Sequence, residues 1–279
     1  MPSDTRRVIR CGLKKNRTDF TISGIKSGPK RVHKMRAVLQ SVTLKSFVVT
    51  TLALGWLSTA TWAQGDSSAL EHVLTQMDTA ARNFKSAEAN VVQDQYDRVI
   101  NETDTEKGKI YFRREGGEVQ MAADFLEPDK KDVIYSGGKL QVYQPKIDQV
   151  NEYSAGKNRS EFDSFVVLGF GGSGHDLQKS FDLKFLGSET VGGVATEKLE
   201  LIPKSARLRN NIARILLWID PARGVSVQQQ FFEPAPNGDY SRANYRLVKY
   251  SDIQTDQKIP DSVFKLKTTG KTKFLSPQG

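Results

Sequence analysis

Hydrophobic residues at helical spacing dominate the segment from Asp66 to Phe84. An apolar side chain recurs there every three or four positions, which places these side chains on one side of a helix of about five turns. Ser68 and Glu71 have the spacing of a capping box, so we expect the helix to begin next to Ser68. An amphipathic helix of this kind must lie on another apolar surface.

From residue 110 onwards the hydrophobic period changes to two, which predicts strands. The segments GKIYFRR and EVQMAADF alternate in this way, and DVIYSGGKLQVYQP is a hairpin with Gly137-Gly138 as its turn. Later strands are separated by the turn signals Gly192-Gly193, Asp220-Pro221 and Asn237-Gly238. About ten strands with short connections and no long crossovers predict a single antiparallel sheet.

Between these strands lies VVLGFGGSGHDL, residues 166–177, in which Gly169, Gly171 and Gly174 match the dinucleotide fingerprint GxGxxG. That fingerprint requires a preceding strand, and a long helix and a parallel strand after the glycines. Here the preceding SEFDSFVVLGF has the spacing of a short helix, and only HDLQKS, barely one turn, follows. The context therefore argues against a nucleotide site.

The same stretch does not form a serine-hydrolase motif. GxSxG would require glycine where His175 stands, and the strained strand-to-helix elbow is missing. We therefore interpret Ser173 and His175 as loop residues and the glycines as a flexible connector. The other histidine after residue 63, His72, is expected on the helix surface, and there is no HExxH motif. The sequence thus predicts no catalytic residue, no metal site and no cofactor.

Charge changes the interpretation only at the N-terminus. The 279 residues carry a net charge of +9, and residues 1–34 hold ten basic and two acidic residues. From residue 64 onwards 29 basic residues face 30 acidic ones. The main part of the chain is therefore electrostatically balanced, and no nucleic-acid partner is expected.

Residues 35–63 have the order of a secretory signal peptide. A mildly basic start at Met35 leads into the apolar run FVVTTLALGWL and then into STATWA, with small residues before the cut. The run is shorter than the ~20 residues of a membrane span. We expect cleavage after Ala63 and export to the periplasm, with residues 1–34 as an extension before the true start. The single cysteine, Cys11, precedes the cut, so the exported chain is expected to lack disulfides and a lipid anchor.

Taken in order, these segments resemble the LolA family, the periplasmic carriers of outer-membrane lipoproteins. The resemblance covers about residues 67–275 and rests on SAEANVVQDQ after the helix, the run from GKIYFRR to YQPKIDQV, the glycine stretch, LGSETVGGVATEKLELIPK, ILLWID and IPDSVFKLKTTG. It implies that residues 64–279 form one mainly β domain. Its expected fold is a single curled antiparallel sheet, an incomplete barrel, with an N-terminal amphipathic helix and short lid helices over an apolar cavity.

The resemblance also implies functional residues. Arg114 falls where the family has an arginine that ties the sheet to the lid, with the adjacent Arg113 as the alternative. Ala123 departs from the large aromatic residue of classical members. The same apolar side chains would also suit an ordinary packed core. The residues expected to line the cavity and contact acyl chains are Leu70, Val73, Leu74, Met77, Met121, Ala123, Phe125, Phe162, Phe165 and Val166.

The function that the resemblance implies is transport rather than catalysis. A monomeric carrier would take triacylated lipoproteins from an inner-membrane exporter and deliver them to an outer-membrane receptor. Two alternatives remain open. One is a periplasmic sensor that binds lipids or lipoproteins with the same half-barrel. The other is a secreted lipid hydrolase, for which the sequence offers no recognisable nucleophile, base or metal set.

Overall fold

The structure, a computed structural model, describes residues 63–156 and 159–276. These residues all belong to one unit, Ser58–Gly279. The predicted extension 1–34 and residues 35–62 of the predicted signal peptide lie outside the described residues. None of the described helices has the length and apolar character needed to cross a membrane.

The described chain consists mainly of strands, with four α-helices. The helices are α1 (Ala63–Asn83), α2 (Arg159–Val166), α3 (Gly174–Ser180) and α4 (Ala206–Arg209), and single 3-10 turns lie at η1 (Pro145–Ile147), η3 (Pro236–Gly238), η4 (Tyr240–Arg242) and η5 (Asp261–Phe264). The strands are β1 (Ser86–Asp97), β2 (Glu102–Glu115), β3 (Glu118–Glu127), β4 (Lys131–Ser136), β5 (Lys139–Gln144), β6 (Gln149–Ser154), β7 (Phe181–Val191), β8 (Val194–Pro203), β9 (Arg214–Asp220), β10 (Val225–Phe232), β11 (Tyr245–Thr255) and β12 (Lys273–Leu275).

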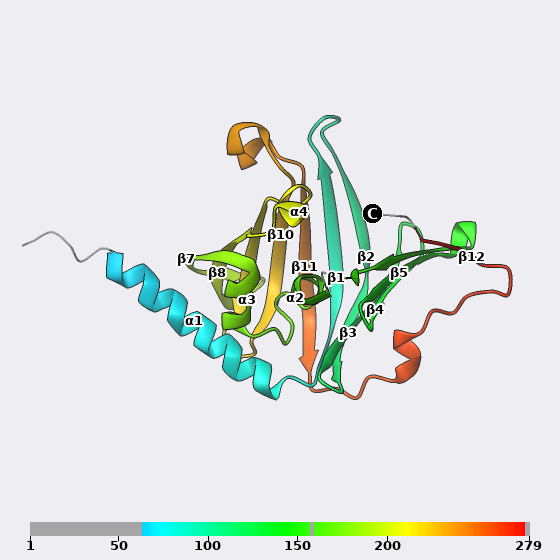
Figure 1. Ribbon diagram of the computed structural model, residues 1–279, viewed down its shortest axis with the longest axis horizontal. Coiled ribbons are helices and arrows are strands. Elements are labelled where there is room, and N and C mark those ends of the chain that lie inside the picture. The colour runs from blue at the N-terminus through cyan, green and yellow to red at the C-terminus, as the bar shows by residue number, and fades with distance from the viewer. Residues whose placement is uncertain (1–62, 157–158, 277–279) are drawn as a thin grey trace, which may run out of the picture. The chain divides into compact units, whose positions relative to one another are not determined.

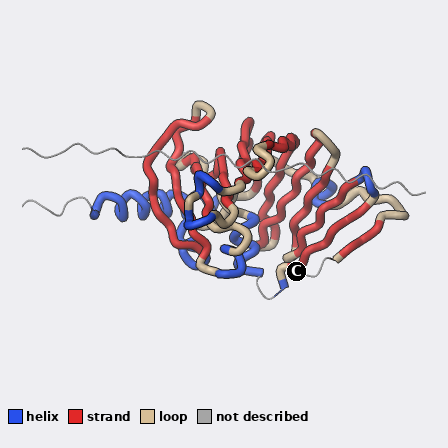
Figure 2. Tube along the Cα trace, turned by 90° about the horizontal axis from the view of Figure 1, so that it is seen from above, coloured by secondary structure: helices blue, strands red, loops and turns tan. Residues whose placement is uncertain are grey.

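All twelve strands form one sheet in the order β12-β6-β5-β4-β3-β2-β1-β11-β10-β9-β8-β7. Neighbouring strands are antiparallel except for the short β12, which runs parallel to β6. The sheet is open, with β12 and β7 at its two edges, and it curves around α2 and α3 (Figures 1 and 2). The predicted mainly β fold with a single curled, incomplete barrel is confirmed.

Ten of the strands occupy the segments whose alternation predicted them. The two that the alternation analysis missed are β1 and β12. In β1 the alternating residues Ala87 and Ala89 are small, so their apolar signal is weak, although both are buried. In β12 only three residues pair, and pairing with β6 rather than hydrophobic burial defines the strand.

Alternation gives the sheet two distinct faces. On β2, Ile110 and Phe112 join the large core that includes α1 and residues 168–177, and we call this side the inner face. Tyr111, between them, lies on the opposite, outer face, against the C-terminal segment around η5. Figure 1 shows α2 and α3 within the curve of the sheet and α1 beside them.

The first helix differs from its predicted start. It begins at Ala63, so Ser68 and Glu71 both lie inside it and the capping-box prediction is wrong. A capping side chain only satisfies backbone N–H groups at a helix start, and it cannot prevent the helix from extending upstream. The apolar side of α1 is as predicted, because Val73, Leu74 and Met77 are buried.

Candidate functional site: the helical lid over the inner face

One apolar core lies between α1, the inner face and the segment 159–180, which we call the lid. Eight of the ten residues predicted to line a cavity belong to this core or pack against it. Buried in it are Val73, Leu74, Met77, Ala123 and Phe125, and packed against it are Leu70, Met121 and Phe165. The other two lie on α2 outside this core; Phe162 tilts against the Tyr135 ring at a centroid distance of 5.4 Å, and Val166 is half-buried. Their contact with cargo stays a prediction.

The middle of the lid is attached to the sheet by Phe170. Its ring stacks on Phe112 of β2 at a centroid distance of 4.2 Å and meets the edge of Tyr250 of β11 at 4.9 Å. Just before Phe170, the backbone is held by β10, because Ser226 N donates to Gly169 O at 2.7 Å and Gln229 Nε2 donates to Leu168 O at 2.6 Å. The lid is therefore fixed by one fully buried aromatic side chain and two hydrogen bonds at its centre.

The glycines beside Phe170 allow close packing, which differs from the flexible connector suggested by the sequence. A side chain at Gly174 would come within 2.6 Å of the backbone oxygen of Leu74 in α1. Gly171 has a positive φ of 75° and lies against the ring of Phe84. Glycine is required at these positions because no Cβ atom fits, and at Gly171 also because of the backbone conformation.

Arg114 joins the sheet to both halves of the helical cover. From β2 its guanidinium donates one hydrogen bond to Ala81 O near the end of α1, at 3.1 Å, and another to Gly171 O in the lid, at 2.5 Å. Its Nε is buried and has no partner among the described residues. This single side chain therefore bridges three elements that would have to separate for the core to open. The gating role implied for Arg114 stays a prediction.

Arg113 lies on the outer face and holds a different segment. It donates to Ile259 O at 3.2 Å and to Asp261 at 2.5 Å, and its guanidinium lies 4.4 Å from the centre of the Phe264 ring. Because successive residues of a strand point to opposite faces, only one of the two arginines can reach the lid. Arg113 contacts the C-terminal segment, so its removal would not be structurally neutral.

A cavity of about 820 Å³ lies at the rim, between α1, the lid and the turn from β2 to β3. None of the ten predicted cavity residues lines it. The charged residues of its lining are Arg82, Arg114, Arg159, Asp78, Glu118, Asp163 and Asp176. Such a mixed polar lining suits an entrance better than a store for acyl chains, which gain affinity from apolar burial. The cavity therefore marks the edge at which the cover meets the sheet.

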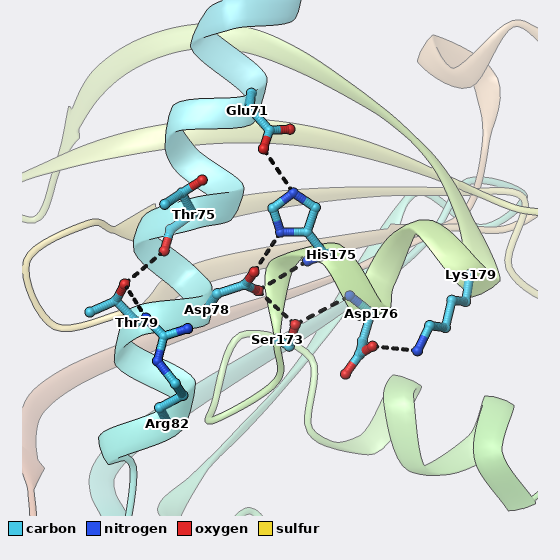
Figure 3. A network of polar contacts seen from close by, with 9 residues as sticks. All are labelled: Glu71, Thr75, Asp78, Thr79, Arg82, Ser173, His175, Asp176 and Lys179. Atoms are coloured by element: carbon cyan, nitrogen blue, oxygen red, sulfur yellow. Dashed lines mark hydrogen bonds and ion pairs between the residues drawn. The ribbon is translucent and has the colours of Figure 1, made fainter.

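A polar cluster beside this cavity fastens α3 to α1 (Figure 3). Ser173 Oγ donates to Asp78 Oδ1 at 2.6 Å, and His175 N donates to the same oxygen at 3.2 Å. The His175 ring places Nδ1 at 2.5 Å from Asp78 Oδ2 and Nε2 at 3.0 Å from Glu71 Oε1. The interpretation of His175 as a loop residue is wrong, because it lies within α3; Ser173 lies just before the helix and caps it.

The carboxylates of this cluster set its charge state. Hydrogen bonds to Asp78 and Glu71 raise the pKa of His175 above its ordinary value of 6.5. Burial tends to raise the pKa of Asp78, but hydrogen bonds from Ser173 and His175 outweigh it, so the pKa of Asp78 is lowered below its ordinary value of 3.8. Both ring nitrogens face carboxylate oxygens, which favours the doubly protonated imidazolium.

The cluster does not have the geometry of a catalytic triad. In a triad the serine hydroxyl donates to a histidine nitrogen, and the carboxylate holds the other nitrogen. Here the Ser173 hydroxyl donates to Asp78 instead, and the second nitrogen of His175 faces Glu71. Among the described residues, no group of three or more His, Cys, Asp or Glu side chains could hold a metal ion. The arrangement serves attachment of the lid.

The family model described as "Outer membrane lipoprotein carrier protein LolA" matches residues 82–267, which is more than half of the chain. The chain belongs to the LolA family. The matched region begins in the last turn of α1 and ends beyond η5, so it includes the whole lid and all strands except β12.

No curated protein matches this LolA-family chain, and solved structures match it at low identity. A DUF1329 family protein from Desulfovibrio piger is 18% identical, with 71% of this chain and 96% of that chain covered and a TM-score of 0.41. A LolA superfamily protein from Nitrosomonas europaea is 15% identical, with 71% and 97% covered and a TM-score of 0.36. In the Pseudomonas aeruginosa MucA/MucB complex the matched chain is 14% identical, with 71% and 61% covered and a TM-score of 0.43.

The polar cluster that fastens α3 to α1 in this LolA-family chain was not predicted from the sequence. Ser173 and Asp176 have the S-x-x-D spacing of a helix start, and that signal was available in the sequence. The acceptor Asp78 follows Glu71 by seven residues, so the two carboxylates share one side of α1. Nothing in the sequence pairs this side with a histidine about a hundred positions away.

Proposed function

We propose that this LolA-family chain carries lipids or the acyl chains of lipoproteins through the cell envelope in its apolar core. Family membership supports this function, and the observation that carries it is the way in which the inner face is covered. The apolar inner face is closed by separate helical segments that are attached through Phe170, Arg114 and the cluster around Asp78. A cover of this kind opens without breaking the backbone hydrogen bonds between strands, because its backbone contact with the sheet is the hydrogen bond from Ser226 N to Gly169 O.

Opening the cover would expose the predicted acyl-contacting residues. Each CH₂ group that is buried contributes ~0.8 kcal/mol, so a few carbons of an acyl chain offset the loss of the polar contacts that hold the lid. In the finer form of this proposal the exported protein is a periplasmic monomer without enzymatic activity. It receives triacylated lipoproteins from an inner-membrane exporter and delivers them to an outer-membrane receptor.

The test starts from the gene expressed from its own start in a Gram-negative host. The periplasmic fraction is purified, its N-terminus is sequenced, and native mass spectrometry identifies any bound lipid or lipoprotein. We expect an N-terminus at Gln64 and bound acyl-containing molecules. A folded protein that contains no such molecule, and does not bind a fluorescent acyl probe, would contradict the carrier function.

Transport itself requires a second measurement. Labelled lipoprotein is released from inner-membrane vesicles and then offered to receptor-bearing outer-membrane vesicles, with and without the purified protein. Carriage predicts label in the acceptor vesicles only when the protein is present. Stable binding without transfer would support a sensor, and hydrolysis of the acyl esters would support an enzyme.

A further inference from the structure

One arginine points into the inner face of the sheet from β11. In the antiparallel register Arg246 lies between Phe231 of β10 and Gln95 of β1. Two residues further along β11 is Val248, which is buried in the large core. Because alternate residues share a face, Arg246 belongs to the same face as the core beneath the lid.

The guanidinium of Arg246 lacks the hydrogen-bonding partners that such a group ordinarily has. Among the five half-buried arginines of the described chain, the other four donate to oxygen atoms, and these are Arg113, Arg114, Arg214 and Arg223. Arg246 has no hydrogen bond or ion pair with a described residue. Its guanidinium carbon lies over the Phe231 ring, 4.9 Å from the ring centre. A guanidinium carries five N–H donors, so a half-buried one without acceptors is set to bind an acceptor from outside the chain.

The two carboxylates whose charges act on Arg246 through space, Glu106 and Glu233, are engaged elsewhere. Glu106 interacts with Arg246 only through space, while both of its oxygens are 2.5 Å from Lys131 Nζ and one also accepts from Gln93 at 2.9 Å. Glu233 accepts a hydrogen bond from Asn244 at 3.1 Å. Burial lowers the pKa of Arg246, because the charged group loses hydration on this face. The charge of Arg246 therefore has no direct counter-ion among residues 63–156 and 159–276.

The place of Arg246 relative to the lid suggests what binds there. Phe231, beneath the guanidinium, also contacts Phe165 of α2, with ring centroids 5.6 Å apart. Movement of α2 would thus uncover an aromatic ring with an apolar core on one side and an arginine on the other. This juxtaposition suits a molecule with one acyl chain and one oxyanion, such as a phosphate or carboxylate, because the planar guanidinium binds oxyanions through paired hydrogen bonds.

We propose that Arg246 binds the anionic headgroup of a lipid whose acyl chain occupies the inner face beneath the lid. This inference rests on the proposed carrier function and favours its lipid form, in which the cargo is an acyl lipid that bears a phosphate or carboxylate, over the form in which the cargo is a triacylated lipoprotein. An anchor attached only through ester and amide bonds has no such group. The site therefore distinguishes anionic lipids from neutral acyl anchors of the same chain length.

The test compares two ligands that differ only in the headgroup. The exported protein is titrated with a 1-acylglycerol 3-phosphate and with the monoacylglycerol of the same chain, both below their critical micelle concentrations. We expect the phosphate lipid to bind roughly tenfold or more tightly, as for hydrogen bonds to a charged donor. Arg246→Met should abolish this preference and leave the affinity for monoacylglycerol unchanged, and Arg246→Lys should retain part of it.

Arg214→Met is the matched control. Arg214 is half-buried on the neighbouring pair of strands and lies over the rings of Phe232 and Tyr240, but on the outer face, where it donates to Glu200 at 2.5 Å. This variant should keep the preference for the phosphate lipid. A third arm tests inorganic phosphate alone, which should compete weakly because it lacks the acyl chain.

The outcomes separate the headgroup site from the carrier function. Equal affinity of the wild type for both lipids, or a preference that persists in Arg246→Met, would overturn the headgroup site and leave the carrier function intact. Competition by inorganic phosphate as strong as by the phosphate lipid would also overturn it in favour of a simple anion site. Failure of the folded wild type to bind either lipid would contradict the carrier function itself. If Arg246→Met does not fold, Arg246→Lys provides the test. It keeps the charge but cannot form the paired hydrogen bonds of a guanidinium, so its preference for the phosphate lipid should be smaller than that of the wild type.

Discussion

Single side chains from different elements close the cover over the inner face. Arg114 reaches from β2 to α1 and to Gly171. Asp78 on α1 accepts hydrogen bonds from the Ser173 hydroxyl and from the backbone N–H of His175, and it also contacts the His175 ring. Each of these contacts joins segments that are far apart in the sequence. Their loss would change how often the cover opens more than it changes the backbone ladder of the sheet.

Arg114→Met is expected to speed the uptake of an acyl probe. Hydrogen bonds from a charged donor typically contribute ~1.5–3 kcal/mol each, and the equilibrium between closed and open states shifts about tenfold per 1.4 kcal/mol. Stopped-flow fluorescence with an acyl probe should therefore show uptake at least about tenfold faster than in the wild type.

Arg82→Met is the control for this variant. Arg82 lines the same cavity, but it is exposed, and within the described part of the chain it donates only to Thr79 of its own helix, at 2.9 Å. It should take up the probe at the wild-type rate. Equal rates for the wild type and Arg114→Met would show that Arg114 does not control the lid. Arg113 is unsuitable as a control because it holds the C-terminal segment on the outer face.

His175 makes attachment of the lid dependent on pH. Its pKa is raised in the folded protein by Asp78 and Glu71, so the stabilisation is fully present below about pH 6.5 and is lost as the pH rises through the folded pKa. Asp176 and Lys179 on the same helix pair with each other, at 2.6 Å. We expect the lid to open more readily as the pH rises above 6.5.

Histidine NMR and probe uptake test this pH dependence together. The His175 ring should titrate at a higher pH than 6.5, and the uptake rate should rise over the same pH range. Uptake in His175→Gln should no longer change with pH in that range. The control is His72→Gln, which changes an exposed residue of α1 and should keep the wild-type pH profile. A pH profile of His175→Gln that matches the wild type would rule out this latch.

Among the elements, α1 and α3 depend on a close approach that only glycine permits. At Gly174, the first residue of α3, an added Cβ would lie 2.6 Å from Leu74 O and 2.7 Å from Leu74 Cα. Both are backbone atoms and cannot rotate away. The two helices would have to move apart, and the hydrogen bonds around Asp78 would lengthen.

Gly174→Ala is therefore expected to destabilise the protein. Overpacking of this kind costs about 1–3 kcal/mol, which corresponds to a fall of several degrees in the thermal midpoint of a domain of this size. Gly172→Ala is the matched substitution two residues earlier, where the nearest atom is 3.5 Å away, an ordinary contact. Differential scanning calorimetry should show a lower midpoint for Gly174→Ala and little change for Gly172→Ala. Equal midpoints would mean that the helices do not pack this closely.

The elements differ in how far the sequence predicted them, for physical reasons. Alternation in β2 records burial of one face, and the continuous apolar run of β9 records burial of both faces, so ten strands and the single sheet followed from local patterns. The start of α1 could not be predicted from local patterns, because a helix cap and a continuing helix have similar local sequences. The C-terminal edge strand β12 has exposed residues throughout and gives no burial signal.

The site was less predictable than the fold. Resemblance to a family predicted that Arg114 faces the lid. The apolar residues of the site were predicted because helical and strand periods mark the positions that face the core. Arg246 carried an available signal, since alternation in YRLVKY puts an arginine on the same face as Val248. The attachment of His175 to Asp78 could not be predicted, because it depends on how α3 returns to α1 after 97 residues.

In the described molecule as a whole, a continuous sheet carries a cover that is attached mainly through side chains. The strands from β6 to β7 form an unbroken antiparallel ladder, and the lid pairs with it through the backbone at the bridge between Phe170 and Val225, where Ser226 N donates to Gly169 O. The lid has two short helices and a loop, held by Phe170 and a few polar groups. Low local stability is expected where few backbone hydrogen bonds must break for opening.

Hydrogen–deuterium exchange should therefore change on cargo binding in the lid and in the end of α1, but not in the sheet. When an acyl ligand enters the core, it displaces Phe170 from Phe112, so amides of residues 167–173 and of the last two turns of α1 should exchange faster. Amides in the β1–β2 pairing should keep their protection, because the ladder stays intact. Ligand-free Arg114→Met should show the same pattern more weakly, since it opens the same segments without cargo. A ligand that only bound the folded surface would slow exchange everywhere by stabilising the native state. Uniform slowing, with no faster exchange at residues 167–173, would show that cargo does not enter beneath the lid.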